Sequence, residues 1–292
     1  MTPRFPLYIP SKGRYEYMMT SKALTEMGVS HYVVAEPQEV ALYQEAVKRF
    51  NLKATIVPLD MSYKSKYELC DDLGLSKSTG PGPARNFAWE HSISNGFDWH
   101  WVMDDNIRYF QRMNKSKRIR CQSGSLFTAM EDFTLRYKNV AMSGPCYSMF
   151  AFRAKMETMP PFIINTRIYS CNFIRNDIPF RWRGRYNEDT ILSLDVLKAN
   201  WCTLQFYAFL QNKINTQTMK GGNTQEFYAK EGTTDKSAMQ VKVHPDCSKI
   251  TMKYGRVHHH VDYLRFKQKP VLRDDIEITE APNEYGMKLK IG

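Results

Sequence analysis

Short apolar runs alternate with amphipathic segments through the first hundred residues of the chain. The apolar runs that indicate strands cover 5–9, 31–35, 54–59 and 98–103, and the segments with helical character cover 15–27, 37–50 and 84–94. Gly28 marks the end of the first helix, and Pro37 stands at the start of the second. Strands that alternate with helices predict an α/β fold with a doubly wound, mixed but mostly parallel central sheet flanked by helices.

Polar clusters follow three of these predicted strands: Ser11 to Arg14, Glu36, and Asp104 to Asn106. In an open α/β sheet, ligands bind beyond the carboxyl ends of the strands. We therefore expect these clusters to share one edge of the sheet and to form the site.

The second half of the chain is less regular. It predicts a helix over 123–137, strands over 140–152 and 161–174, a helix over 187–198 that Asn187 caps, and a strand over 201–210. The polar sequence from about residue 212 onward shows few helix signals. We expect it to form a lid and a C-terminal wrap over the site.

An excess of basic residues narrows the class of partner. The chain has 41 Lys and Arg against 30 Asp and Glu, for a net charge of +11. This balance suits a polyanion such as nucleic acid, a nucleotide or an anionic membrane surface. The six scattered cysteines include no C-x-x-C pair, which argues against a zinc ribbon or a disulfide framework.

The apolar runs are too short for a membrane protein. None approaches the roughly 18 residues that a spanning helix needs, and residues 1–10 lack the pattern of a secretory signal. The sequence therefore predicts a soluble, cytoplasmic protein with no membrane partner.

Two adjacent acids, Asp104 and Asp105, end the fourth predicted strand. Neighbouring carboxylates repel one another unless a cation or several hydrogen bonds offset that repulsion. A Mg²⁺ or Mn²⁺ ion with oxygen ligands, completed by a nucleoside diphosphate, would fit here. An acidic turn that caps the next segment is the alternative.

Two further acids, Glu188 and Asp189, open the predicted helix at 187–198. Carboxylates in a first turn gain from the helix dipole, so simple capping is one interpretation. They follow a basic and aromatic run, Arg181-Trp182-Arg183-Gly184-Arg185, which favours a pocket wall. A carboxylate there could deprotonate an acceptor hydroxyl.

Phosphate contacts are expected at two loops. Lys12 and Arg14 lie on the first strand-to-helix turn, where a pyrophosphate commonly lies. The loop from Gly80 to Asn86 enters a helix, and its backbone and Arg85 could hold phosphates. The alternatives are a solvated turn and a structured loop with an exposed arginine.

The run His258-His259-His260 lies on a predicted strand over 256–263. Side chains alternate along a strand, so at most two of the three share a face, and one could ligate a metal. The segment 112–120 holds five basic residues in nine. It is expected to be a solvated loop, or to follow a phosphate backbone.

Taken in order, these motifs resemble the TET-associated glycosyltransferases, a group of GT-A enzymes found largely in bacteriophages. The resemblance covers roughly residues 5–265 and rests on the segments 9–14, 33–37, 80–86, 104–106 and 187–189. It implies sugar transfer to 5-hydroxymethylpyrimidines in DNA. Asn106 stands where a second Asp of the D-x-D element is usual.

The resemblance also implies roles for individual residues. The nucleotide sugar would be held by Pro10, Lys12, Arg14, Glu36, Arg85 and Asp104. The metal would be bound by Asp105 with His258 or His259, and Asp189 or Glu188 would be the catalytic base.

These observations lead to one hypothesis, which is metal-dependent and inverting transfer from a UDP-sugar to hydroxymethylated DNA. The DNA contacts would come from Arg118, Arg120, Arg181, Trp182, Arg183 and Arg185. A glycan or protein acceptor, a nucleotidyltransferase and a non-catalytic DNA-binding module are the alternatives. We expect one domain over 1–265, with a nucleotide-sugar half at 1–110 and an acceptor half at 111–265, followed by a tail at 266–292.

Overall fold

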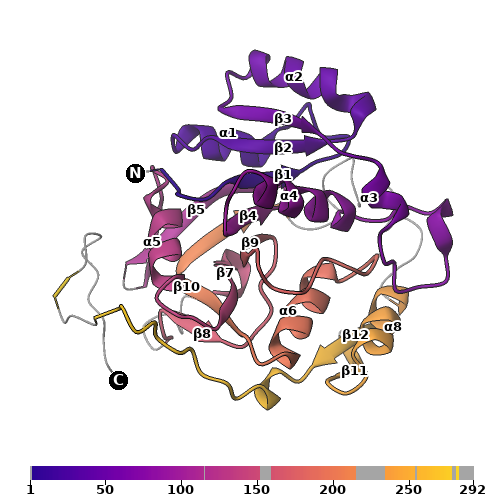
Figure 1. The fold of residues 1–292 in the computed structure, drawn as a ribbon, viewed down its shortest axis with the longest axis vertical. Coiled ribbons are helices and arrows are strands. Elements are labelled where there is room, and N and C mark those ends of the chain that lie inside the picture. Colours follow the sequence, from indigo (N-terminus) through magenta and orange to yellow (C-terminus); the bar gives the residue numbers. More distant parts are fainter. Residues whose placement is uncertain are drawn as a thin grey trace.

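One large sheet runs through both halves of the chain (Figure 1). The computed structural model describes residues 2–114, 116–151, 159–214, 234–253, 255–277 and 281–282. The strands are β1 (Leu7–Pro10), β2 (His31–Ala35), β3 (Ala54–Pro58), β4 (Trp99–Met103), β5 (Ile107–Asn114), β6 (Lys117–Arg120), β7 (Val140–Tyr147), β8 (Phe162–Ile164), β9 (Cys171–Arg175), β10 (Cys202–Lys213), β11 (Ser248–Lys253) and β12 (Arg256–Val261). The helices are α1 (Met19–Glu26), α2 (Val40–Arg49), α3 (Ser62–Ser65), α4 (Gly82–Ser94), α5 (Ser125–Thr134), α6 (Glu188–Lys198) and α8 (Thr234–Val243).

The strand order defines where a ligand can bind. It is β3-β2-β1-β4-β9-β7-β10-β5-β6, and β8 pairs with β10. The four strands β3, β2, β1 and β4 are parallel, whereas β9 and β5 run antiparallel to their neighbours. The chain moves outward from β1 through β2 to β3 and then returns to the other side of β1 with β4. This reversal between β1 and β4 is a topological switch point, the usual ligand crevice of such sheets.

Successive side chains of the central strands point to opposite faces of the sheet, and each face has its own hydrophobic core. Leu7 and Ile9 of β1 pack in one core with residues of α1, α2 and α5. Tyr8, between them, packs in the other core with residues of α4 and α6. Each face is therefore covered by helices, and the predicted α/β architecture is confirmed.

Several elements of the second half differ from the prediction. The segment 161–174 contains two short strands, β8 and β9, rather than one. The basic segment 112–120, expected to be a loop, lies in the β5–β6 hairpin. The region after 233 contains α8 and β11, although its polar composition gave few helix signals. The predicted strand at 256–263 is confirmed as β12.

Asn187 does not cap α6 with its side chain. It adopts a left-handed backbone with φ of 56°, and its Nδ2 donates instead to the carbonyl of Lys236 at 2.6 Å. The predicted cap is therefore wrong. The side-chain amide of Asn187 instead links the start of α6 to α8, a helix that sequence analysis missed.

The described part of the C-terminal segment, up to residue 277, does not wrap over the site. Lys138 N–H donates to the carbonyl of Val271 at 2.9 Å, and Arg273 N–H donates to the carbonyl of Arg136 at 2.8 Å. Residues 136–138 precede β7, which runs parallel to β4, so this contact is at the edge of the sheet opposite the switch point. The predicted lid falls partly on 215–233, outside the described residues. In the part of the chain that the structure describes, no helix has the length and apolar character to cross a membrane.

A close approach between β7 and β9 generates a stability prediction. A Cβ built on Gly144 would lie 2.2 Å from the carbonyl oxygen of Cys171. Gly144→Ala should therefore lower the free energy of unfolding by about 1–3 kcal/mol, because backbone must move to relieve the clash. Urea denaturation measures this change.

Gly28→Ala is the matched control for this variant. Gly28 has a positive φ of +76° but nothing within 4 Å of a built Cβ. It should therefore show backbone strain alone, without a clash, at about 1–2 kcal/mol. Equal midpoints for wild type and Gly144→Ala would contradict the close packing of β7 against β9.

Candidate active site

The carboxyl ends of β1 and β4 bring Ser11, Arg14 and Asp105 together. Ser11 Oγ donates to Asp105 Oδ2 at 2.7 Å, and Arg14 pairs with Asp105 Oδ1 through Nη1. Tyr43 of α2 supports both, because its hydroxyl donates to Ser11 Oγ at 2.8 Å and accepts from Arg14 N–H at 3.1 Å. The polar clusters after the first and fourth strands therefore converge on one edge, as expected.

Asp104 lies between two cationic side chains. Arg85 Nη2 pairs with its Oδ1 at 2.8 Å, and Lys213 Nζ pairs with its Oδ2 at 2.9 Å. Lys213 also donates to Ser170 Oγ at 2.7 Å. The backbone N–H of Asp104 donates to the carbonyl of Ser170 at 2.7 Å. The ends of β4 and β10 and the start of β9 thus meet at this carboxylate.

Arg85 connects this edge to the beginning of α6. Its Nη1 pairs with Asp189 Oδ1 and lies 3.6 Å from Glu188 Oε1. The arginine is only 2% exposed, and its guanidinium lies 4.5 Å from the centroid of the Trp182 ring. Ser170 N–H, at 3.4 Å, donates to Asp189 Oδ2. Arg85 and Ser170 therefore both hold Asp189 beside the end of β4.

The surroundings separate the acids by their affinity for a proton. Burial alone would raise the pKa of Asp104, but the charges of Lys213 and Arg85 lower it to about 2. Burial raises the pKa of Glu188 to about 7, and Arg85 opposes this shift. Burial also raises the pKa of Asp105, against the pull of Arg14. Pairs of acids with such different environments are typical of sites that carry out acid–base chemistry.

A second polar group follows β2. Lys64 pairs with Glu36 Oε1, Lys12 lies 3.4 Å from the same oxygen, and Gln38 donates to Oε2 at 2.6 Å. Burial opposes ionisation of Glu36, but the bonds from Lys64 and Gln38 lower its pKa. Pro10 is the last residue of β1. The roles of Pro10, Lys12 and Glu36 toward a nucleoside stay predictions.

The predicted metal ligands do not form a free ligand set. Hard cations such as Mg²⁺ bind through carboxylate oxygens. Both oxygens of Asp104 pair with protein cations, and those of Asp105 contact a cation and a hydroxyl. The partners are Arg85, Lys213, Arg14 and Ser11. A divalent ion at 104–105 would share these carboxylates with protein side chains, and the metal role of Asp105 stays a prediction.

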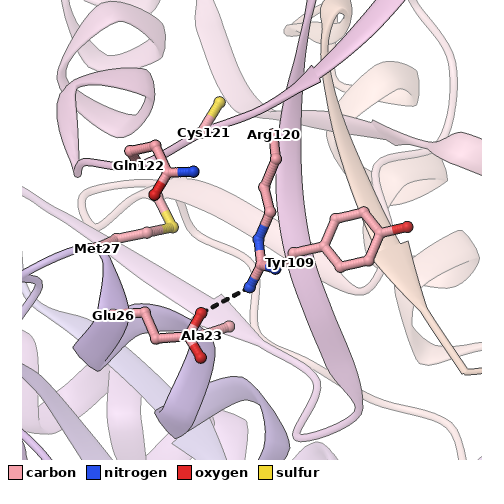
Figure 2. Close-up of a pocket in the computed structure, with 7 residues that line it drawn as sticks. All are labelled: Ala23, Glu26, Met27, Tyr109, Arg120, Cys121 and Gln122. Carbon is pink, nitrogen blue, oxygen red and sulfur yellow. Dashed lines mark hydrogen bonds and ion pairs between the residues drawn. The ribbon is translucent and has the colours of Figure 1, made fainter.

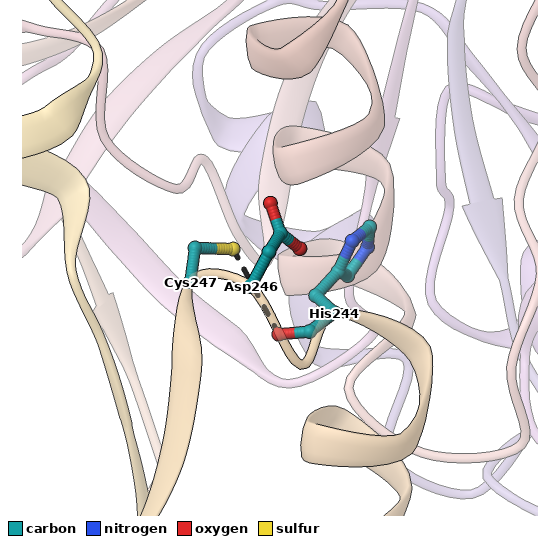
Figure 3. Close-up of side chains that lie close together, drawn as sticks. All are labelled: His244, Asp246 and Cys247. Atoms are coloured by element: carbon teal, nitrogen blue, oxygen red, sulfur yellow. Dashed lines mark hydrogen bonds between the residues drawn. The ribbon is translucent and has the colours of Figure 1, made fainter.

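The histidines do not join these acids. His258 and His259 lie on β12, and within the described residues they form no group with Asp105 whose ligand atoms lie within 4.8 Å of one another. Such a group does exist at His244, Asp246 and Cys247 (Figure 3). This group lies between α8 and β11. Cys247 packs against the last turns of α6, so the group is distant from the acids at the start of that helix.

Two of the four predicted DNA contacts in the run 181–185 are buried. Arg185 is 1% exposed and binds both carboxylate oxygens of Asp71, at 2.7 and 3.1 Å. Trp182 is 1% exposed and lies against Arg85. These positions contradict the predictions that Arg185 contacts a DNA backbone and that Trp182 stacks on an extruded base.

The other two arginines of this run form ion pairs closer to the surface. Arg183 binds both oxygens of Asp195, at 2.8 and 3.0 Å. Arg181 pairs with Glu90 at 2.8 Å and its side chain is 37% exposed. A DNA role for Arg181 and Arg183 stays a prediction, and either contact would compete with an existing carboxylate.

Arg118 and Arg120 lie on β6. Arg120 is half exposed, pairs with Glu26 at 2.6 Å, and lines a small pocket with Tyr109 between α1 and the hairpin (Figure 2). Arg118 donates to the carbonyl of Ala151. Their predicted contact with DNA is not tested by these positions.

Sequence analysis missed Lys213, Ser170 and Tyr43. Lys213 fell in the polar sequence after about residue 212 that was expected to form a lid, because the predicted strand stopped at 210, three residues short of the observed end of β10. Ser170 fell inside a predicted strand. The residues that complete β10 are all polar, Gln211, Asn212 and Lys213, so no local signal extended this strand toward the site.

The burial of Arg185 leads to a second stability prediction. Arg185→Met would leave the Asp71 carboxylate without its cation and would also remove donors to the carbonyls of Gly74 and Ser78. We expect the free energy of unfolding to fall by about 3–5 kcal/mol. Urea denaturation gives the value.

Arg181→Met is the control for this variant. Its ion pair with Glu90 is partly exposed, so its removal should cost about 1 kcal/mol or less. If Arg185→Met kept wild-type stability and only weakened DNA binding, the structural assignment of Arg185 would be wrong.

Comparison with known proteins identifies a family for most of the chain. The model of the TET-associated glycosyltransferase family matches residues 5–222. This range includes Arg14, Arg85, Asp104, Asp189 and Lys213, and it ends before α8. No curated protein matches the chain.

Proposed function

The chain belongs to the TET-associated glycosyltransferase family, and from this premise we propose that it moves a sugar from a UDP-sugar to a hydroxymethylpyrimidine in DNA. The acceptor group would be the hydroxyl of 5-hydroxymethylcytosine or a related base. The observation that carries the proposal is the buried Arg85, which joins Asp104 at the end of β4 to Asp189 at the start of α6. This pairing places an acid beside the crevice in which the family fold would hold a donor.

The proposed reaction is one displacement with inversion. The acceptor oxygen attacks the anomeric carbon, the bond from that carbon to the diphosphate oxygen breaks, and the diphosphate leaves with the electron pair. Asp189 takes the hydroxyl proton. Arg85 and Ser170 N–H hold its two oxygens, which fixes the carboxylate in position. Glu188 lies next to it and has the weaker hold, with Arg85 at 3.6 Å.

In this proposal, basic side chains stabilise the negative charge of the leaving diphosphate. Lys213 and Arg14 lie on either side of the 104–105 turn, and Lys12 lies on the same loop as Arg14. Cations held in place near a developing negative charge stabilise it most in a site that excludes water. No step is built on the predicted Mn²⁺ or Mg²⁺ ion, because the carboxylates of Asp104 and Asp105 already have protein partners.

A base within a duplex cannot reach an acid that is mostly covered. The Asp189 side chain is 18% exposed, so the acceptor base would have to leave the stack or be offered as a single strand. The net charge of +11 suits the phosphate backbone that would come with it.

The proposal predicts product formation on one class of acceptor. Incubation with a panel of UDP-sugars should glycosylate DNA that contains 5-hydroxymethylcytosine, and nucleoside mass spectrometry would detect the adduct. Parallel reactions with EDTA and with Mn²⁺ test the predicted ion. We expect turnover to persist in EDTA, because side-chain cations supply the positive charge for the leaving diphosphate. Transfer to glycans or proteins but not to DNA would overturn the acceptor, and incorporation of the whole nucleotide would indicate a nucleotidyltransferase.

The two adjacent acids are expected to differ in their importance for turnover. Asp189→Asn removes the proposed base with little change of shape and should lower kcat by about 10²- to 10⁴-fold. Its binding of UDP, measured by calorimetry, should stay close to wild type. A variant with wild-type kcat would exclude Asp189 as the base.

Glu188→Gln is the matched control and has its own pH signature. The pKa of Glu188 is raised to about 7 from an ordinary value of 4.5, so the unfolded chain loses this proton first as the pH rises. Wild-type stability should therefore fall as the pH rises from about 4.5 to about 7. In Glu188→Gln this fall should be smaller while transfer persists. A complete loss of transfer in this variant would move the base to Glu188.

A further inference from the structure

The two-stranded ribbon β11–β12 has one face made only of polar and basic residues. Its register places Lys249 opposite His260, Thr251 opposite His258, and Lys253 opposite Arg256. Directly opposed residues point to the same side of an antiparallel pair. These six residues therefore share one face, and the remaining pairs, which include Ile250 with His259 and Met252 with Val257, form the other.

The basic face is the outer one. Lys249, Lys253, Arg256 and His260 are exposed, and Thr251 and His258 are half-buried. On the other face, Val261 packs against the cluster of Leu194, Leu197 and Cys247 on the side of α6. The opposite face is therefore packed on the body of the protein at Val261, whereas Ile250 and Met252, nearer the free end, are 47% and 65% exposed. The cations of the outer face are in solvent along its whole length.

The charges on this face are not balanced. Lys253 and Arg256 stand directly opposite each other, and like charges in that arrangement destabilise a strand pair. Within the described residues, no ion pair joins Lys249, Lys253 or Arg256 to an acid. A polyanion on the outer face would offset this repulsion.

The ribbon is also connected to the proposed base. Helix α8 packs on both of its strands, and the carbonyl of Lys236 in α8 accepts the hydrogen bond from Asn187, the residue before α6. Glu188 and Asp189 follow directly. In Figure 1, α8 and the ribbon lie together beside α6. An acceptor that contacts the ribbon is therefore positioned relative to the start of α6.

We propose that the outer face of β11–β12 docks on the phosphate backbone of duplex DNA. The face is formed by Lys249, Thr251, Lys253, Arg256, His258 and His260. This inference rests on the proposed DNA acceptor, but it concerns a region beyond residues 5–222, where the family model matches. A two-stranded ribbon also has the width to enter a major groove.

The test compares two matched double variants in the full chain. Lys249→Glu/Lys253→Glu reverses two charges on the ribbon. Lys48→Glu/Lys53→Glu reverses two exposed lysines beside β3, which lies at the opposite end of the molecule from the ribbon in Figure 1. Fluorescence anisotropy with a labelled duplex gives the dissociation constant at several salt concentrations, with and without hydroxymethylcytosine.

The ribbon variant should bind the duplex at least tenfold more weakly than the control variant at the same salt concentration. Its slope of log affinity against log salt should be shallower by about 0.9 for each phosphate that the variant no longer neutralises. Its melting temperature should equal or exceed that of wild type, because the new carboxylate at 253 faces Arg256. Weak binding by a variant of unchanged stability would show that the ribbon itself holds the duplex, since a misfolded variant would melt earlier.

Two results would overturn the inference, and they differ in meaning. Equal DNA affinity of the ribbon and control variants, in a protein that glycosylates DNA, would reject the ribbon and leave the proposed function intact. Wild-type protein that neither binds nor glycosylates DNA would reject the proposed function and the docking face together.

Discussion

Arg85 is a buried cation surrounded by three carboxylates, and the arrangement of the site depends on its charge. Asp104, Glu188 and Asp189 come from segments that are distant in sequence. Without a cation between them, these acids would repel one another in surroundings that offer little water. A buried ion pair of this kind adds little net stability, but removing one partner is costly. The side chain therefore fixes where α6 begins relative to β4.

The sheet topology explains why this cation can reach all three acids. The chain reverses direction across the sheet between β1 and β4, so the loops after those strands lead to opposite sides of this point. The start of β9 and the end of β10 lie at the same edge and bring Ser170 and Lys213. Helix α4 then carries Arg85 under Trp182. The fold thus places cations on both sides of Asp104, which gives the site a charge pattern that suits an anionic leaving group.

Sequence analysis predicted the regular part of this arrangement well, because its signals are local. The strand at 31–35 has the bounds that were expected, and the polar clusters after the first and fourth strands meet as the parallel order requires. Trp182 and Arg185 were misjudged because a basic and aromatic run looks the same whether it is exposed or buried. The burial of Arg185 depends on its ion pair with Asp71, which is 114 residues away in the chain, so no local pattern predicts it. The ribbon face was also missed, since only the register reveals that its cations share one side.

Trp182 gives the site an optical consequence. Its indole ring is buried and lies 4.5 Å from the Arg85 guanidinium. The emission of an indole responds to the electric field of a nearby charge, so any ligand that draws Arg85 away from this ring changes the light that the protein emits. One of the five tryptophans of the chain therefore lies beside Arg85, and its emission can report a movement of that guanidinium without a label.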